Sequence, residues 1–357
     1  MNVMLDNLLR YRSEFPILER TNYMISNSLG AMPRGVYDAL KAYADTWATR
    51  GVRAWEERWW MLSAEVGNGL GALMNAPKDS VSVHQNVTTC QAVVASCFDF
   101  SGQRNKVVYS DLNFPSVMYF WEAQRPYGAQ VHMVKTDDGI TVSTERLLDA
   151  IDEQTLLVPI SHVIFRSAYI QDAKAIIEKA HKVGAHVVLD TFQSLGTVPV
   201  DVEALNVDFA CGGVLKWLCG GPGVAYLYAR PDLGSKLEPK LTGWFAHQDS
   251  MAFEVGPIRY TNPPLRFMNG TTHIPSLEAC RPGLVWITTP AAWVKCAPAA
   301  TTPPLPRPVA IGFQVDDIAA TRNLLTSRGV EVCEGRDGGV WVDAKYACGT
   351  TLGFFEC

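Results

Sequence analysis

The sequence predicts an α/β fold with a mostly parallel sheet, followed by a small βαβββ module. The first observation is that short apolar, strand-like segments alternate with helix-like segments over residues 1–285. Such alternation is typical of a parallel sheet with helices packed on its faces. The second is a segment rich in Pro, Ala and Thr at residues 286–308, and the third is a compact strand and helix pattern at residues 309–357. We therefore expect a large domain, a semi-rigid linker and a small module at these boundaries.

The elements of the large domain follow from composition and spacing. Four apolar segments are predicted to be strands, at residues 107–110, 129–134, 156–161 and 186–190. Between the last two, residues 172–183 place four apolar side chains at helical spacing. Ligands of such sheets bind at the carboxyl ends of strands, so Asp190, at the end of its strand, marks the expected site.

The small module shows the same kinds of signal. Residues 309–315 are apolar and strand-like, and Asp316 and Asp317 open a helix at 318–327 that Gly329 follows. Three more strands are expected at 330–333, 339–343 and 350–355.

Composition narrows the class of protein. The chain has 357 residues and a net charge of −5, with acids and bases mixed along it, which argues against nucleic acid as a main partner. No apolar run approaches the roughly 18 residues of a membrane span, and the first residues lack the basic and apolar regions of a signal peptide. Nine cysteines occur without a Cys-x-x-Cys motif, which favours reduced thiols. We expect a cytoplasmic protein.

Asp190 and Lys216 form the pair that points to chemistry. Asp190 ends an apolar strand, and Lys216 follows in the glycine-rich segment 212–223. A lysine amine forms a Schiff base with pyridoxal phosphate, and a carboxylate pairs with the pyridinium nitrogen, so that the ring withdraws electrons. The pair predicts pyridoxal 5'-phosphate as the cofactor, with Lys216 and Asp190 as catalytic residues.

Two further segments match the needs of this cofactor. Thr88 and Thr89 precede a helix-like apolar run, and hydroxyls and backbone amides at a helix start form an anion site suited to phosphate. Phe114 follows the strand at 107–110, where a ring could cover the face of the pyridine.

These residues resemble a known family. Residues 1 to about 280 look like the fold-type I, class V aminotransferase superfamily, and within it kynureninase. The segments that carry the resemblance are Asn27-Ser28-Leu29-Gly30, Thr88-Thr89, Phe114-Pro115-Ser116, Asp190, Lys216, residues 243–247, Thr261-Asn262-Pro263-Pro264 and Gly270-Thr271-Thr272.

The resemblance implies a set of roles and an assembly. Lys216 would carry the Schiff base, Asp190 would hold the pyridinium, and Phe114 would stack on the ring. Thr88 and Thr89 would bind phosphate, with Trp244 and Asn262 completing that side or reaching in from a neighbouring subunit of a homodimer. The remaining implied residues are Ser161, His162 and Gln193 beside the cofactor, and Asn27 and Ser28 beside the substrate.

Several positions depart from the kynureninase pattern. Val117 stands where that pattern has an acid, Gln193 where it has a His, and Leu215 where a phosphate-binding Tyr is typical. In the family a long helix and a small C-terminal domain, which supplies an arginine for the substrate carboxylate, follow at this point; we expect the proline-rich segment to replace that domain after Leu277. Arg166 or Arg266 would have to replace that arginine, although a surface or supporting role is expected for each.

The tail resembles a different superfamily. Residues 313–318 and 349–356 look like one βαβββ module of the vicinal oxygen chelate superfamily, to which glyoxalases belong. The usual first-strand His position of that superfamily is occupied by Ala310 or a neighbour, and the usual last-strand Glu position by Gly353, with Glu356 out of register. No metal site is therefore expected.

The sequence therefore predicts an enzyme that acts on an α-amino acid through a Schiff base at Lys216. A kynureninase-like lyase or hydrolase and a class V aminotransferase both begin in this way, as do β-elimination and epimerisation, and the sequence does not choose among them. The alternative is a protein that binds the cofactor but has impaired catalysis, because the small C-terminal domain is replaced.

Overall fold

The fold was taken from a computed structural model, which describes residues 11–288, 311–315, 317–334, 340–342 and 352–356. The chain divides into two compact units, Met1–Cys296 and Ala297–Cys357. The boundary between them falls inside the predicted linker at 286–308. The predicted start of that linker is wrong, because residues 286–288 are the end of a helix that begins at Ile274; the linker residues from 289 onward lie outside the described residues. In the described parts of the chain, no helix is both long enough and apolar enough to cross a membrane.

The first unit is built on a seven-stranded sheet with the order β1-β7-β6-β5-β4-β2-β3. Its strands are β1 (Val81–His84), β2 (Lys106–Ser110), β3 (Gln130–Val134), β4 (Thr155–Ser161), β5 (His186–Asp190), β6 (Phe209–Gly213) and β7 (Ala225–Ala229). The five strands from β6 to β3 are parallel, whereas β7 is antiparallel to both β6 and β1. The prediction of a mostly parallel sheet is therefore confirmed, as are the four strands expected from the sequence.

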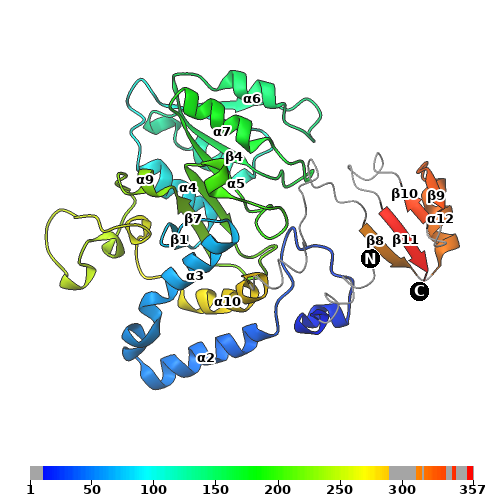
Figure 1. The fold of residues 1–357 in the computed structure, drawn as a ribbon, viewed down its shortest axis with the longest axis horizontal. Coiled ribbons are helices and arrows are strands. Elements are labelled where there is room, and N and C mark those ends of the chain that lie inside the picture. The colour runs from blue at the N-terminus through cyan, green and yellow to red at the C-terminus, as the bar shows by residue number, and fades with distance from the viewer. Residues whose placement is uncertain (1–10, 289–310, 316, 335–339, 343–351, 357) are drawn as a thin grey trace. The chain divides into compact units, whose positions relative to one another are not determined.

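Helices surround this sheet. They are α2 (Gly35–Arg50), α3 (Trp60–Leu73), α4 (Val87–Ser96), α5 (Pro115–Glu122), α6 (Thr144–Ala150), α7 (Ala173–Lys182), α8 (Val202–Leu205), α9 (Pro231–Gly234) and α10 (Ile274–Thr288). Short turns of 3-10 helix lie at Arg12–Glu14, Pro16–Glu19, Arg125–Tyr127, Trp244–Ala246, Ser250–Ala252 and Leu265–Phe267, and one turn of π-helix lies at Trp55–Trp59. The long helix α2 runs beside α10 (Figure 1).

Apolar side chains cover both faces of the sheet. Consecutive residues of β5 belong to different apolar clusters: Val187 packs with residues of α3 and α7, and Val188 packs with residues of α4 and α5. Successive side chains of a strand point to opposite faces, so each cluster fills one side of the sheet. This double burial explains why the predicted strands are nearly continuous apolar runs.

The helix starts follow local capping rules. The Asn86 side chain accepts a hydrogen bond from the Thr89 backbone N–H at 2.9 Å and so caps α4. Asp172 does the same for α7, with the Ala175 backbone N–H at 3.0 Å. The predicted helix at 172–183 is confirmed, and its start is set by this cap.

The second unit holds β8 (Ile311–Val315), α12 (Ile318–Ser327), β9 (Val332–Glu334), β10 (Val340–Val342) and β11 (Leu352–Glu356). Its sheet has the order β8-β11-β10-β9, with β8 and β11 parallel and the other pairs antiparallel. The described elements of this unit follow one another in the order β-α-β-β-β. Residue 310, one of the positions compared with a metal ligand, lies outside the described residues, and the resemblance to vicinal oxygen chelate modules stays a prediction.

Candidate active site

Asp190 and Lys216 line one cavity of about 410 Å³ at the carboxyl ends of the parallel strands. Asp190 is the last residue of β5, where it pairs in register with Ser161 of β4 and Cys211 of β6. Lys216 comes three residues after the end of β6. The cavity is lined by Asn27, Ser28, Phe114, Ser161, Val163, Phe165, Asp190, Phe192, Gln193, Leu215 and Lys216. Seven of the twelve residues predicted for the site therefore meet here.

The Asp190 carboxylate is buried with little to compensate its charge. Its Oδ1 accepts a hydrogen bond from the Phe192 backbone N–H at 2.9 Å. Burial raises the pKa of Asp190 to about 6, against the opposing effects of this hydrogen bond and of the Lys216 ammonium. A carboxylate in this state favours a cation beside it, because a cation would offset the desolvation of its charge.

Lys216 is held in an apolar setting that suits a nucleophilic amine. Burial lowers the pKa of Lys216, while the charge of Asp190 acts in the opposite direction. The Nζ atom lies 4.6 Å from the ring centroid of Phe192 and 5.5 Å from that of Phe114. A lowered pKa increases the fraction of neutral amine, which is the form that attacks a carbonyl carbon.

The N-terminal segment closes one side of the cavity. The Gly30 N–H donates to the Leu215 carbonyl at 2.7 Å, and a Cβ at position 30 would lie 2.0 Å from the Lys216 carbonyl oxygen. Only glycine permits this close approach of two backbones. The Gln193 side chain donates to the Asn27 carbonyl at 3.1 Å and accepts from the Trp217 indole at 2.9 Å. These contacts fix Asn27 and Gln193 at the cavity.

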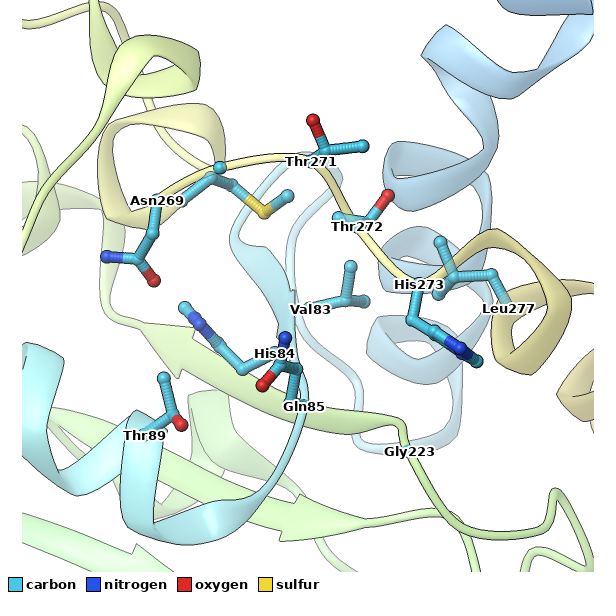
Figure 2. A pocket seen from close by; sticks show the side chains of 12 residues that line it. Val83, His84, Gln85, Thr89, Gly223, Asn269, Thr271, Thr272, His273 and Leu277 are labelled. Atoms are coloured by element: carbon cyan, nitrogen blue, oxygen red, sulfur yellow. The ribbon is translucent and has the colours of Figure 1, made fainter.

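The predicted phosphate residues lie elsewhere. Thr88 is exposed at the start of α4, and Thr89 lines a second cavity of about 230 Å³. Figure 2 shows Thr89 at the helix start, near His84 and across from the segment that carries Asn269 and Thr272. The backbone N–H and hydroxyl of Thr89 both donate to Asn86 Oδ1, so its amide already has a partner.

Three other predicted residues are also outside the Lys216 cavity. Trp244 is exposed and packs against Trp60 and Phe253, and Asn262 is exposed before a cis Pro263–Pro264 bond. His162 is buried and directly follows β4, and its sequence neighbours Ser161 and Val163 line the cavity, whereas His162 is not among the lining residues. Its Nδ1 has no hydrogen-bond partner among the residues that the structure describes, and burial lowers the pKa of His162 to about 4.

The two arginines considered for a substrate carboxylate differ in the structure. The Arg266 guanidinium donates to the backbone carbonyls of Thr261 (2.7 Å), Ser235 and Leu237 (3.3 Å), which commits it to holding a loop. Arg166 is exposed, and its guanidinium lies 5.4 Å from the ring centroid of Phe165, which lines the cavity. Arg166 follows β4 in a hairpin closed by a bridge between Val163 and Ile170.

The site contains apolar walls that the sequence analysis missed. Val163, Phe165 and Phe192 line the cavity, and Phe165 meets the Phe114 ring edge-on at 5.1 Å between centroids. Phe192 was detectable in principle, since it lies two residues after Asp190 at the end of a predicted strand. Phe165 depends on the hairpin after β4, for which the sequence carries no turn signal that we recognised.

The residues of the cavity fit pyridoxal phosphate. A buried carboxylate with a raised pKa suits a pyridinium, a lysine with a lowered pKa suits a Schiff base, and Phe rings suit a planar heterocycle. The cavity offers fewer residues for the phosphate group of the cofactor. Leu215 has no hydroxyl, and Thr88 and Thr89 do not line this cavity.

Comparison with protein families gives the same assignment. The family model for aminotransferase class-V matches residues 22–293. The chain belongs to this family. An uncharacterized aminotransferase of Bacillus subtilis (strain 168) is 32% identical over 77% of this chain and 71% of its own length. The cofactor expected from Asp190 and Lys216 agrees with this membership.

Several kynureninases are similar at the same level. The enzyme of Pseudomonas fluorescens is 32% identical over 78% of this chain and 68% of its own length, and that of Bacillus cereus (ATCC 14579) is 31% identical over 70% and 60%. The chain thus spans less than two thirds of the Bacillus cereus kynureninase.

Solved structures show the same fold at lower identity. The apo cysteine desulfurase of Thermococcus onnurineus NA1 superposes with a TM-score of 0.71 at 19% identity, covering 94% of this chain and 81% of its own. The cystine C-S lyase C-DES, solved with cysteine persulfide, gives 0.68 at 20% identity over 77% and 74%.

Proposed function

We propose that this chain is a pyridoxal-phosphate enzyme that acts on an α-amino acid through a Schiff base at Lys216. The observation that carries the proposal is that a buried, poorly compensated Asp190 carboxylate and a Lys216 amine of lowered pKa line one cavity. When bound, the cofactor supplies an electron-withdrawing ring to the bonds at the substrate's α-carbon.

Each cavity residue has a role in this proposal. Lys216 binds the cofactor and then moves a proton at the α-carbon, and Asp190 keeps the pyridine nitrogen protonated. Phe114 stacks on the ring, and Ser161, Gln193, Asn27 and Ser28 contribute polar contacts around the cofactor and substrate. Arg166 attracts the substrate carboxylate, because its guanidinium is exposed beside the cavity wall formed by Phe165.

The reaction class is proposed as kynureninase-like cleavage or class V amino-group transfer. The kynureninase relatives support the first and the Bacillus subtilis aminotransferase supports the second. Desulfuration with a persulfide on Cys219 is disfavoured. Cys219 lies in a tight loop at φ 54°, and burial raises the pKa of its thiol to about 11.

We also propose a homodimer in which each subunit completes the other's site. Trp244 and Asn262 are exposed and lie outside the Lys216 cavity of their own chain, as expected of residues that reach a neighbouring copy. The exposed apolar residues Tyr37 and Trp47 on α2 are further candidates for that interface. The module at 309–357 is proposed to fold as a separate unit without a metal.

The test is the absorbance spectrum of purified protein with added pyridoxal phosphate, before and after borohydride. We expect a Schiff-base band that borohydride removes, and a reduced adduct on the peptide that contains Lys216. Lys216→Ala should abolish both, whereas the exposed Lys236→Ala should leave them unchanged. An adduct on a different lysine would contradict the proposal.

Titration with a panel of amino acids that includes kynurenine, cysteine and alanine then distinguishes an active enzyme from a protein that only binds the cofactor. A band that shifts with one amino acid, together with product formation, supports an enzyme and identifies its substrate class. A band that no amino acid shifts supports the alternative, a chain that binds the cofactor with impaired catalysis.

A further inference from the structure

Trp217 directly follows Lys216, and the sequence analysis assigned it no role. It is half-buried and is not among the residues that line the Lys216 cavity. Its indole Nε1–H donates to Gln193 Oε1 at 2.9 Å, and the Nε2 of the same amide donates to the Asn27 carbonyl at 3.1 Å. Gln193 therefore bridges the loop that carries Lys216 and the N-terminal segment at the cavity.

The chemistry of both neighbours fixes the orientation of the Gln193 amide. An indole N–H can only donate a hydrogen bond, and a backbone carbonyl can only accept one. The amide oxygen of Gln193 must therefore face Trp217, and its nitrogen must face Asn27. An amide turned the other way would place its nitrogen against the indole N–H and its oxygen against the carbonyl, and both hydrogen bonds would be lost.

The bridge reaches residues that the proposed function assigns to the substrate. Asn27 and Ser28 line the cavity and are exposed, so burial does little to fix their positions. Three residues after Asn27, the Gly30 N–H donates to the Leu215 carbonyl at 2.7 Å. The segment 27–30 is thus held at one end by Gln193 and at the other by Leu215, which both line the same cavity.

We propose that Trp217 is a positioning residue for the substrate: it orients the Gln193 amide, which in turn holds Asn27 and Ser28 at the cavity. This inference rests on the proposed function and deepens it, because it adds a residue outside the cavity to substrate binding. Trp217 acts through Gln193, so its effect falls on the binding of the amino acid and not on the lysine that precedes it in the sequence.

The experiment measures KM and kcat of the full chain with pyridoxal phosphate bound, using the amino acid that shifts the absorbance band. Trp217→Phe keeps an aromatic ring and removes the indole N–H. We expect it to raise KM by about threefold to tenfold, the effect of losing one neutral hydrogen bond, with little change in kcat. The Schiff-base band and its removal by borohydride should match those of the parent, because Lys216 is unchanged.

Two variants at position 193 test whether Trp217 acts through the amide. Gln193→Glu can still accept from the Trp217 indole but cannot donate to the Asn27 carbonyl, so it should raise KM at least as much as Trp217→Phe does. Gln193→Leu removes both hydrogen bonds. Adding Trp217→Phe to Gln193→Leu should cost nothing further, because the amide that the indole orients is already gone.

Trp121→Phe is the matched control. The Trp121 indole N–H also donates to a glutamine, Gln91 Oε1, at 3.0 Å, but both residues are fully buried and neither lines the cavity. The variant removes the same kind of hydrogen bond and should leave KM close to that of the parent. The thermal midpoint of each variant, measured alongside, shows that the assayed protein is folded.

The outcomes distinguish failure of the proposed function from failure of this inference. A parent chain that forms no borohydride-reducible adduct, or that converts no amino acid of the panel, overturns both. In an active parent, an unchanged KM for Trp217→Phe, or a fall in kcat in place of the rise in KM, overturns the positioning role alone. A similar rise in KM for Trp121→Phe would attribute the effect to loosening of the fold. Independent, additive losses for Trp217→Phe and Gln193→Leu would show that Trp217 does not act through Gln193.

Discussion

Two buried aspartates of the same sheet, Asp208 and Asp190, differ in how many partners surround their carboxylates. Asp208, just before β6, has a side chain that is only 1% exposed and is surrounded by donors. His181 Nε2 lies at 2.9 Å, His186 Nδ1 at 3.2 Å, Arg230 at 3.3 Å, and the Val187 backbone N–H at 2.9 Å. Asp190, at the end of β5, has the Phe192 backbone N–H and the more distant charge of Lys216.

The difference appears in their pKa values. Burial acts to raise the pKa of both carboxyls, but hydrogen bonds from His186, Val187 and His181 bring that of Asp208 below its usual value. The pKa of Asp190 instead rises to about 6. A buried carboxylate with satisfied partners stabilises the fold, whereas one left with few partners at a cavity marks a place for a cationic ligand.

The largest expected effect that tests this contrast is on catalysis. Asp190→Ala should still allow the Lys216 adduct to form but should lower turnover by several orders of magnitude, because protonation of the pyridine nitrogen is lost. Turnover is measured with the amino acid that shifts the absorbance band. Asp208→Asn should leave turnover of the folded protein close to that of the parent. Full activity of Asp190→Ala would mean that a different acid holds the pyridinium.

The second prediction concerns Asp208 and the stability of the fold. Asp208→Asn should lower the free energy of unfolding by about 3 kcal/mol, since it leaves His181, His186 and Arg230 without their buried partner. Denaturant unfolding of the apo protein measures this loss. A loss below ~1 kcal/mol would show that water replaces the carboxylate at these partners, and would weaken the contrast.

The third prediction concerns pH. The folded pKa of Asp190, about 6, lies above the unfolded value of about 3.9, so the folded chain binds more protons between these values. The contribution of Asp190 to stability therefore falls as pH rises from about 4 to about 6, by at most about 3 kcal/mol, and stays low above that. The groups whose charges act on Asp190 include Lys216, while Cys90, Cys211 and Tyr226 lie near it as buried neutral groups.

The measurement compares unfolding of apo parent and apo Asp190→Asn at pH 5 and pH 8. The free energy of unfolding of Asp190→Asn should increase relative to that of the parent as pH rises, because the asparagine never carries the buried charge. Asp208 gives the opposite sign: its lowered pKa adds stability above about pH 4 that is lost in more acidic solution. If the difference in unfolding free energy between parent and Asp190→Asn is the same at both pH values, the charge of Asp190 is already compensated in the apo chain.

The sequence alone identified Asp190 and Lys216 because a strand end and a glycine-rich loop are local signals. Phe114, Ser161 and Gln193 also reach the predicted cavity, since each follows or ends a strand of the same parallel sheet. The antiparallel direction of β7 could not be predicted, because a five-residue apolar strand carries no mark of its direction. The closeness of the Phe192 ring to Gly213 depends on how β5 and β6 come together, which is a long-range property. Thr89 is at a helix start as expected, but the loop at Asn269–His273 shares its cavity, and that contact is not visible in the sequence.

The smallest expected effect concerns the two arginines that lie near these sites. Arg230 is held by Asp208 and Asp232, whereas Arg166 makes no ion pair within the described part of the chain and lies at 5.4 Å from the centroid of Phe165. If Arg166 attracts the substrate carboxylate, Arg166→Gln should raise KM by about fivefold to tenfold, as expected for one exposed charge-assisted contact, with little change in kcat. Arg166→Lys should recover part of this loss, and the absorbance titration with pyridoxal phosphate should be the same for all three proteins. An equal KM for parent and Arg166→Gln would mean that a residue of the neighbouring subunit binds the substrate carboxylate. It would also show that the lack of an Asp or Glu partner at Arg166, within the described part of the chain, does not indicate a functional role.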